Sequence, residues 1–295
     1  MKKQLVSILT LGVLLLASCG GESNNATTKV DSTAEDTVNN RIEEAQKIYE
    51  FIPSPKIMAE LLMNANVPYQ SKIMHDVQSV DKYTSSKQKA LNLGIYGADL
   101  NYCNVYEKTH ETMLYLRCTQ SLSEDMGIEN AISENTITRA EENADNRDSM
   151  SQIISDMFYE LEDYLQENDK EDISALVIAG GWVEGLYLAV MSVDEKNPNQ
   201  AIMNNIAEQK YSLEHLIHLL ESYKEVPTVT DAHTEIVKLK PIYDGINITK
   251  EANTVTTAED GVTTIGGNSK IEFSMDQLKQ IKTTVTEIRE SFIKI

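Results

Sequence analysis

Cysteine is scarce in this sequence, which has three among its 295 residues. Small secreted domains that are held together by disulfides need more than that, so a disulfide framework is excluded. Cys19 belongs to an amino-terminal motif described below, which leaves Cys103 and Cys118. On one continuous helix these two would lie roughly 22 Å apart, although a turn between them would bring them closer. We expect two free, buried thiols in apolar helical surroundings.

Basic residues are also few. The chain has 26 Lys and Arg against 46 Asp and Glu, which gives a formal net charge of -20. This balance excludes a nucleic-acid partner, because the phosphate backbone needs clustered Lys and Arg. The same balance disfavours peripheral binding to anionic lipid. We interpret the acidity as a solubility-promoting surface, with specific cation binding as the alternative.

The common catalytic motifs are missing. No Gly-x-Ser-x-Gly nucleophile elbow occurs in the sequence. Gly180-Gly181 has neither the preceding strand nor the following Lys-Ser or Lys-Thr of a phosphate-binding loop. We therefore predict no catalytic residues and favour a protein that is not an enzyme.

Two histidine spacings resemble metal-ligand motifs. Glu107-x-x-His110 places two ligands on one helix face, and His215-x-x-His218 does the same. Di-iron sites in helical bundles use Glu-x-x-His on two helices together with two further glutamates. Only one true Glu-x-x-His is present, so we predict no metal site and no cofactor. A metal-dependent redox enzyme is kept as an alternative.

The first residues have the parts of a secretory signal. Lys2 and Lys3 supply positive charge, and an apolar run follows over residues 5–16. The run is too short to cross a bilayer, which takes about 20 apolar residues. Leu16-Ala17-Ser18-Cys19 then matches a lipobox, in which small residues precede a cysteine that is acylated. An ordinary secretory signal with a chance cysteine is the alternative.

The lipobox predicts where the mature protein is attached. Residues 1–18 are expected to be removed as a signal peptide, leaving Cys19 with fatty acids such as palmitate that anchor it to a membrane. Residues 19–40 are rich in Ser, Thr, Asn, Asp and Glu, and such a segment buries too little apolar surface to offset its ordering entropy. We expect a disordered tether. Position 20 is Gly and not Asp. By resemblance to proteobacterial sorting rules, this favours attachment to the outer membrane over the inner one, and we expect the domain to face the periplasm.

Helical periodicity dominates the remainder up to about residue 224. Ser54 and Pro55 form an N-cap with proline at the first helical position, which predicts a helix over residues 56–64. Its expected apolar face consists of Ile57, Leu61 and Leu62.

A long helical segment over residues 85–125 is expected to break near 101–104, and Gly127 follows at a C-cap position. Further helices are predicted over residues 134–144, 147–166, 172–193, 199–223 and 231–243.

The character of the chain changes after these helices. Residues 246–271 are rich in Thr, Val and Gly, with turn signals at Asp260-Gly261 and Gly266-Gly267. This pattern predicts a short Thr/Gly-rich β-hairpin or loop. Ser274 and Gln277 then form a capping box that opens a last helix.

Two segments about 86 residues apart resemble each other. Residues 93–100 (LGIYGADL) align with residues 179–186 (AGGWVEGL), and each lies inside a helical pattern that a second helix follows. We therefore predict an all-α fold: an antiparallel helical bundle built from two weakly repeated helical hairpins. The glycine-bearing helices are expected side by side at its centre, within a single helical domain over residues 41–295.

The same segments supply the candidate ligand-binding residues. Glycine inside a helix costs about 1 kcal/mol relative to alanine, so close helix contact or room for a ligand must offset that cost. If both helices face one cavity, the aromatic rings stack on a ligand and the carboxylates orient it. The alternative is that the glycines let two helices touch while the rings fill the core. The candidates are Gly94, Tyr96, Asp99, Gly180, Gly181, Trp182 and Glu184.

Several motifs together resemble those of a group of helical lipoproteins from Bacteroidetes. They are the lipobox, Ile52-Pro53-Ser54-Pro55, the two glycine segments and residues 260–265 (DGVTTI). The resemblance covers most of the mature chain and implies an envelope compartment and a helical fold. The group brings no established activity, so no catalytic residues carry over.

The expected function is that of a lipid-anchored envelope protein acting as a binding or scaffold module. A scaffold implies an envelope protein as partner. The alternative is a small-ligand-binding protein that uses the glycine-bearing helices.

Overall fold

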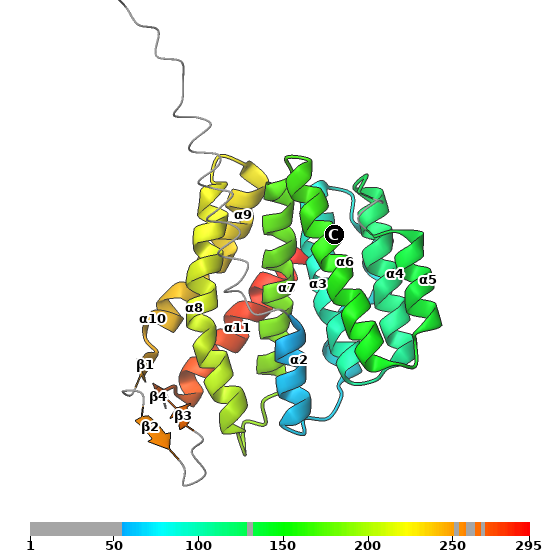
Figure 1. Cartoon of the computed structure of the whole chain (residues 1–295). Helices are drawn as coiled ribbons and strands as arrows, with labels where there is room; N and C mark the ends of the chain where they lie inside the picture. Colours follow the sequence, from blue (N-terminus) through cyan, green and yellow to red (C-terminus); the bar gives the residue numbers. More distant parts are fainter. Residues whose placement is uncertain (1–54, 129–131, 251–253, 258–262, 267–268) are drawn as a thin grey trace, which may run out of the picture. The chain divides into compact units, whose positions relative to one another are not determined.

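A computed structural model describes residues 55–128, 132–250, 254–257, 263–266 and 269–295. The predicted signal peptide, Cys19, the tether and Ser54 therefore lie outside the described residues. Within them the helices are α2 (Pro55–Asn64), α3 (Ser86–Val105), α4 (Thr109–Asp125), α5 (Glu134–Glu142), α6 (Arg147–Glu167), α7 (Glu171–Met191), α8 (Gln200–Ser222), α9 (Pro227–Ile236), α10 (Lys240–Asp244) and α11 (Met275–Phe292). The predicted all-α fold class is confirmed (Figure 1).

Helices α3 and α7 form the centre of the bundle and pack on each other more extensively than any other pair that the structure describes. All of α3 from Ala90 to Val105 is buried, and α7 is buried almost throughout. Helix α7 is apolar on nearly all sides, which is typical of a core helix. Helix α7 is also long and apolar enough to cross a membrane, but 83% of that stretch is buried inside the protein, as expected of a core helix.

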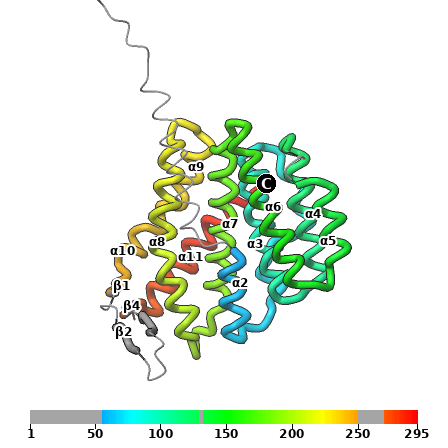
Figure 2. Tube along the Cα trace, in the orientation of Figure 1, coloured from blue at the N-terminus to red at the C-terminus, as the bar shows by residue number. Residues whose placement is uncertain are grey.

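The other helices surround this pair. Helix α4 packs on α3, α8 packs on α7, and α6 contacts both central helices. Figure 2 shows α4 and α5 on one side of the central pair and α8, α9 and α10 on the other. Helices α2 and α11 also contact α7, so the central pair is enclosed by elements from both ends of the domain.

The segment before the carboxy-terminal helix is a hairpin, as predicted. Strand β1 (Asn247–Lys250) pairs antiparallel with β4 (Ser269–Glu272), and β2 (Thr254–Thr257) pairs antiparallel with β3 (Thr263–Gly266). In the sequence, the β2–β3 pair lies between the two strands of the β1–β4 pair. Asp260-Gly261 lies outside the described residues.

Several local predictions are confirmed. Ser274 and Gln277 make both bonds of the capping box at the start of α11. Gly127 has a φ of 68°, the left-handed conformation of a helix C-cap. Cys103 and Cys118 are buried, free thiols.

Three predicted details differ in the structure. The break expected within residues 85–125 is present, but it lies later than residues 101–104, because α3 continues through Val105 and the reversal follows at Glu107, which has a φ of 55°. Helix α9 begins at Pro227 rather than at residue 231, because proline occupies its first turn. In α2 the side chain of Ile57 is 50% exposed. Its buried residues are Met58, Ala59 and Leu62.

The central helices touch through two glycines. A Cβ atom added to Gly94 would lie 1.9 Å from the carbonyl oxygen of Val177, and one added to Gly180 would lie 1.9 Å from that of Leu91. Since no side chain fits in these spaces, glycine is required for the two backbones to approach so closely. The contact accounts for glycine inside two helices despite its low helix propensity.

Alanine at the contact should therefore destabilise the fold, whereas alanine one turn away should not. We expect Gly94→Ala and Gly180→Ala each to lower the free energy of unfolding by about 3 kcal/mol or more, because the clash is with backbone. Gly185→Ala is the matched control, since the nearest atom to its added Cβ is 4.0 Å away. It should raise stability by up to about 1 kcal/mol through helix propensity.

Urea denaturation of the three variants measures these changes. Equal stability of Gly94→Ala and Gly185→Ala would show that the helices do not touch at this point.

Candidate functional site

A buried ion pair joins α7 to α11. Arg289 donates from Nε to Glu184 Oε2 at 2.5 Å and from Nη2 to Glu184 Oε1 at 2.8 Å. Glu184 is fully buried, and Arg289 is 7% exposed. The guanidinium carbon lies 4.3 Å from the centre of the Tyr187 ring. Removal of either charge would leave the other one buried and uncompensated.

Asp99 on α3 places a second carboxyl group beside this pair. It is fully buried, and its Oδ2 accepts a hydrogen bond from the backbone N–H of His75 at 2.9 Å. Burial and the neighbouring Glu184 charge raise the pKa of Asp99 well above its usual value, more than Arg289 lowers it. Two ionised carboxylates against one guanidinium would leave net charge in the interior. We therefore expect Asp99 to be protonated at pH 7, so that one carboxylate, Glu184, faces one guanidinium.

Tyrosines hold His75 against the central helices. Its Nε2 atom lies 2.6 Å from the hydroxyl of Tyr83, and its ring centre lies 4.9 Å from that of Tyr96. Tyr115 on α4 donates to the carbonyl oxygen of His75 at 2.6 Å, and Tyr96 donates to that of Asp76 at 2.9 Å. Burial lowers the pKa of His75 to about 4, so its ring is neutral at pH 7. These bonds tie the segment between α2 and α3 to the core.

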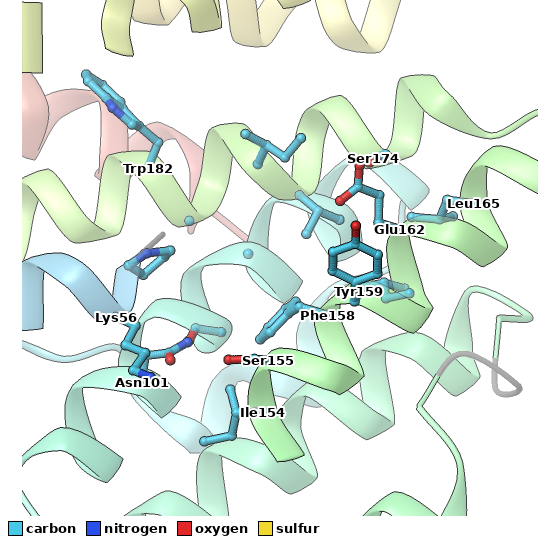
Figure 3. Close-up of a pocket in the computed structure, with 17 residues that line it drawn as sticks. Lys56, Asn101, Ile154, Ser155, Phe158, Tyr159, Glu162, Leu165, Ser174 and Trp182 are labelled. Atoms are coloured by element: carbon cyan, nitrogen blue, oxygen red, sulfur yellow. The ribbon is translucent and has the colours of Figure 1, made fainter. Parts of the chain in front are cut away.

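A cavity of about 280 Å³ lies on another side of the central helices, between α2, α3, α6 and α7 (Figure 3). Its floor includes backbone at Gly94, Gly97 and Gly181. Its walls are mainly apolar side chains of α6 and α7: Ile154, Phe158, Leu161, Leu165, Val177, Ile178 and Trp182. The volume is close to the lower end for small-molecule sites, about 300 to 1,000 Å³.

Few polar groups line this cavity, and Figure 3 shows them in two places. Lys56 and Asn101 lie at one end of the view, and Glu162 and Ser174 lie at the other. Burial, together with the adjacent charge of Asp163, raises the pKa of Glu162 to about 7.

The structure divides the seven predicted ligand-binding residues into two groups. Three of them line the cavity: Gly94, Gly181 and Trp182. The other four lie in the packed core: Tyr96, Asp99, Gly180 and Glu184. Each residue of a helix is rotated by about 100° from the one before, so residues two positions apart point to nearly opposite sides. Trp182 and Glu184 therefore cannot face the same space. The two acids are brought together, but away from the cavity.

Three site residues were missed in the sequence. Arg289 is buried on α11 four residues after the core residue Val285, and a charged residue on the apolar face of a helix was a usable signal. Glu162 and His75 carry no comparable signal, because an acidic run and an isolated histidine are common on protein surfaces. Among the described residues, no three His, Cys, Asp or Glu side chains converge to hold a metal ion.

The protonation of Asp99 can be tested by substitution. We expect Asp99→Asn to change the free energy of unfolding by no more than about 1 kcal/mol, since an amide is as uncharged as the protonated acid and keeps the acceptor for the His75 N–H. Arg289→Met should lower it by about 3 to 5 kcal/mol, because it leaves the Glu184 carboxylate unpaired. Urea denaturation at pH 7 measures both. A loss for Asp99→Asn as large as that for Arg289→Met would mean that Asp99 is ionised.

Comparisons with protein-family models, with curated proteins and with solved structures find no match for this chain.

Proposed function

We propose that this protein is a lipid-anchored lipoprotein of the bacterial envelope whose helical domain binds a small, largely apolar molecule. The observation that carries the proposal is the cavity, which both glycine-bearing helices line: Gly94 and Gly97 belong to α3, and Gly181 and Trp182 belong to α7. Of the functions considered from the sequence, small-ligand binding is the one that requires such a space.

The lining suits an apolar ligand. Protein interiors are close-packed, and a void of this size leaves its lining atoms without partners on one side. An apolar molecule would restore those contacts, whereas water would find few hydrogen-bonding groups. Ser155 and Tyr159 are exposed residues that also line the cavity, with Tyr159 72% exposed, so the space is reachable from solvent.

A scaffold that binds another protein has less support. Such a role usually needs a contiguous exposed apolar patch. The large apolar side chains that are exposed in the described part of the chain lie on different elements: Ile57, Leu114, Tyr159, Tyr211 and Ile295. We therefore favour the alternative of a small-ligand-binding protein over a scaffold.

The envelope location is supported by the lipobox at Leu16–Cys19 and the apolar run before it. We propose that acyl chains on Cys19 hold the domain at the outer membrane, facing the periplasm. The tether would let the domain reach ligands near the bilayer.

Acylation can be tested in bacterial cells supplied with labelled palmitate. Wild-type protein should incorporate the label and fractionate with membranes, whereas Cys19→Ala should do neither, because the acceptor thiol is gone. Ser23→Ala lies outside the lipobox and should behave as wild type. Mass spectrometry of the native protein gives an independent check. Retention of residues 1–18, or a first cysteine without fatty acid, would overturn the proposed anchor.

Ligand binding can be tested with phenylbutanol, a neutral apolar probe. Trp182 is the only tryptophan and lines the cavity, so its fluorescence should change on binding. Ser155→Phe should fill the cavity and weaken binding about tenfold or more, which corresponds to about 1.4 kcal/mol. Glu160→Phe places the same ring on an exposed position of α6 that does not line the cavity and should leave affinity unchanged.

The titration uses lipidated protein in non-ionic detergent, with protein-free micelles as blank and circular dichroism to check folding. No change in Trp182 fluorescence up to the solubility limit of the probe, or equal binding by both variants, would contradict the proposed function.

A further inference from the structure

Glu162 is an unusual residue for the wall of an apolar cavity. It lies on α6 between Phe158 and Leu165, one helical turn on either side, and both of these side chains also line the space. A carboxylate that is partly removed from water is costly unless a counter-charge or several hydrogen bonds compensate it. The partners of Glu162 therefore decide what this end of the cavity accepts.

The described neighbours of Glu162 do not neutralise its carboxylate. In the part of the chain that the structure describes, its carboxylate accepts one hydrogen bond from Nε2 of Gln166 on its own helix, at 3.2 Å. The charge beside it, Asp163, has the same sign, and the pKa of Glu162 rises to about 7. No Lys, Arg or His among the described residues lies within ion-pair distance of Glu162.

The cationic side chain that lines the cavity lies away from Glu162. Lys56 is the one Lys, Arg or His among the described lining residues, and it pairs with Glu60 at 3.8 Å. Figure 3 shows it at the opposite end of the view from Glu162. The cavity therefore combines an apolar middle with an acidic end to which the described residues supply no counter-ion.

We propose that the ligand is an amphipathic cation: an apolar body that fills the space between α6 and α7, and a protonated amine that pairs with Glu162. This inference rests on the proposed function of the cavity and adds the charge of the ligand. The amine would supply the counter-charge that the carboxylate lacks. The phenol ring of Tyr159, which also lines the cavity, offers a cation a favourable π face.

Anionic ligands fit less well. A fatty acid would place a second carboxylate in the same apolar space as Glu162, and the formal net charge of -20 repels anions at longer range. A neutral alcohol would fill the apolar part and leave Glu162 uncompensated. The three head groups should therefore bind in the order amine, alcohol, carboxylate.

Three probes that share one apolar body test this order: phenylbutylamine, phenylbutanol and phenylbutyrate. They are titrated into the full lipidated protein in non-ionic detergent at about pH 8, where a primary amine is still protonated. Trp182 fluorescence and calorimetry report binding. We expect the amine to bind at least about tenfold more tightly than the alcohol.

Two isosteric variants separate a local ion pair from the general acidity of the protein. Glu162→Gln should remove the preference for the amine while leaving the affinity for the alcohol unchanged, which also shows that the cavity is intact. Glu160→Gln removes an exposed charge on the same helix and should keep the preference.

The outcomes distinguish this inference from the proposed function. If the alcohol binds and Ser155→Phe weakens it, but the amine has no advantage, the cavity function stands and the cationic ligand is wrong. The cationic ligand is also wrong if Glu162→Gln keeps the preference for the amine, or if Glu160→Gln loses it equally. If no probe binds wild-type protein, both proposals fail.

Discussion

The close approach of α3 and α7 at Gly94 and Gly180 is the constraint on which the rest of the interior depends. Helices normally pack with their axes about 8 to 10 Å apart, at a distance that their side chains set. Where both contact positions lack a side chain, the backbones meet, and the neighbouring residues are directed to the flanks of the contact. One flank holds Asp99 and Glu184 with Arg289. Another holds the cavity, whose floor is partly backbone.

The buried charges do more to fix position than to add net stability. Desolvation of a guanidinium and a carboxylate offsets most of their mutual attraction. However, Arg289 finds two well-aligned acceptors only at Glu184, so the pair sets where α11 docks on α7. Apolar packing by Ile281 and Val285 supplies the larger favourable term but tolerates small shifts. With the pKa of Asp99 raised by burial, the expected charge balance is one anion, Glu184, for one cation, Arg289.

Much of this fold could be predicted from the sequence, because its signals are local. Periodicity, caps and turn glycines lie within a few residues of the helix ends that they mark. The pairing of the glycine-bearing helices also followed from their own residues. The orientation of each helix about its axis did not, since it depends on tertiary contacts, and Ile57 is exposed for that reason. The partners of Glu184 and Asp99 lie 105 and 24 residues away, at Arg289 and His75, and no local pattern connects them.

The distribution of charge in the interior explains why the predicted acids and the cavity separate. Glu184 is already paired with Arg289, and the raised pKa of Asp99 favours its neutral form, so a ligand would gain little by approaching them and would have to displace packed side chains. Glu162 has no cation within ion-pair distance among the residues that the structure describes, and it lines the cavity. In an apolar environment the favourable place for a ligand charge is beside the group that still lacks an opposite charge. The most buried acids therefore hold the fold together, and the partly buried acid is the one through which a ligand would be selected.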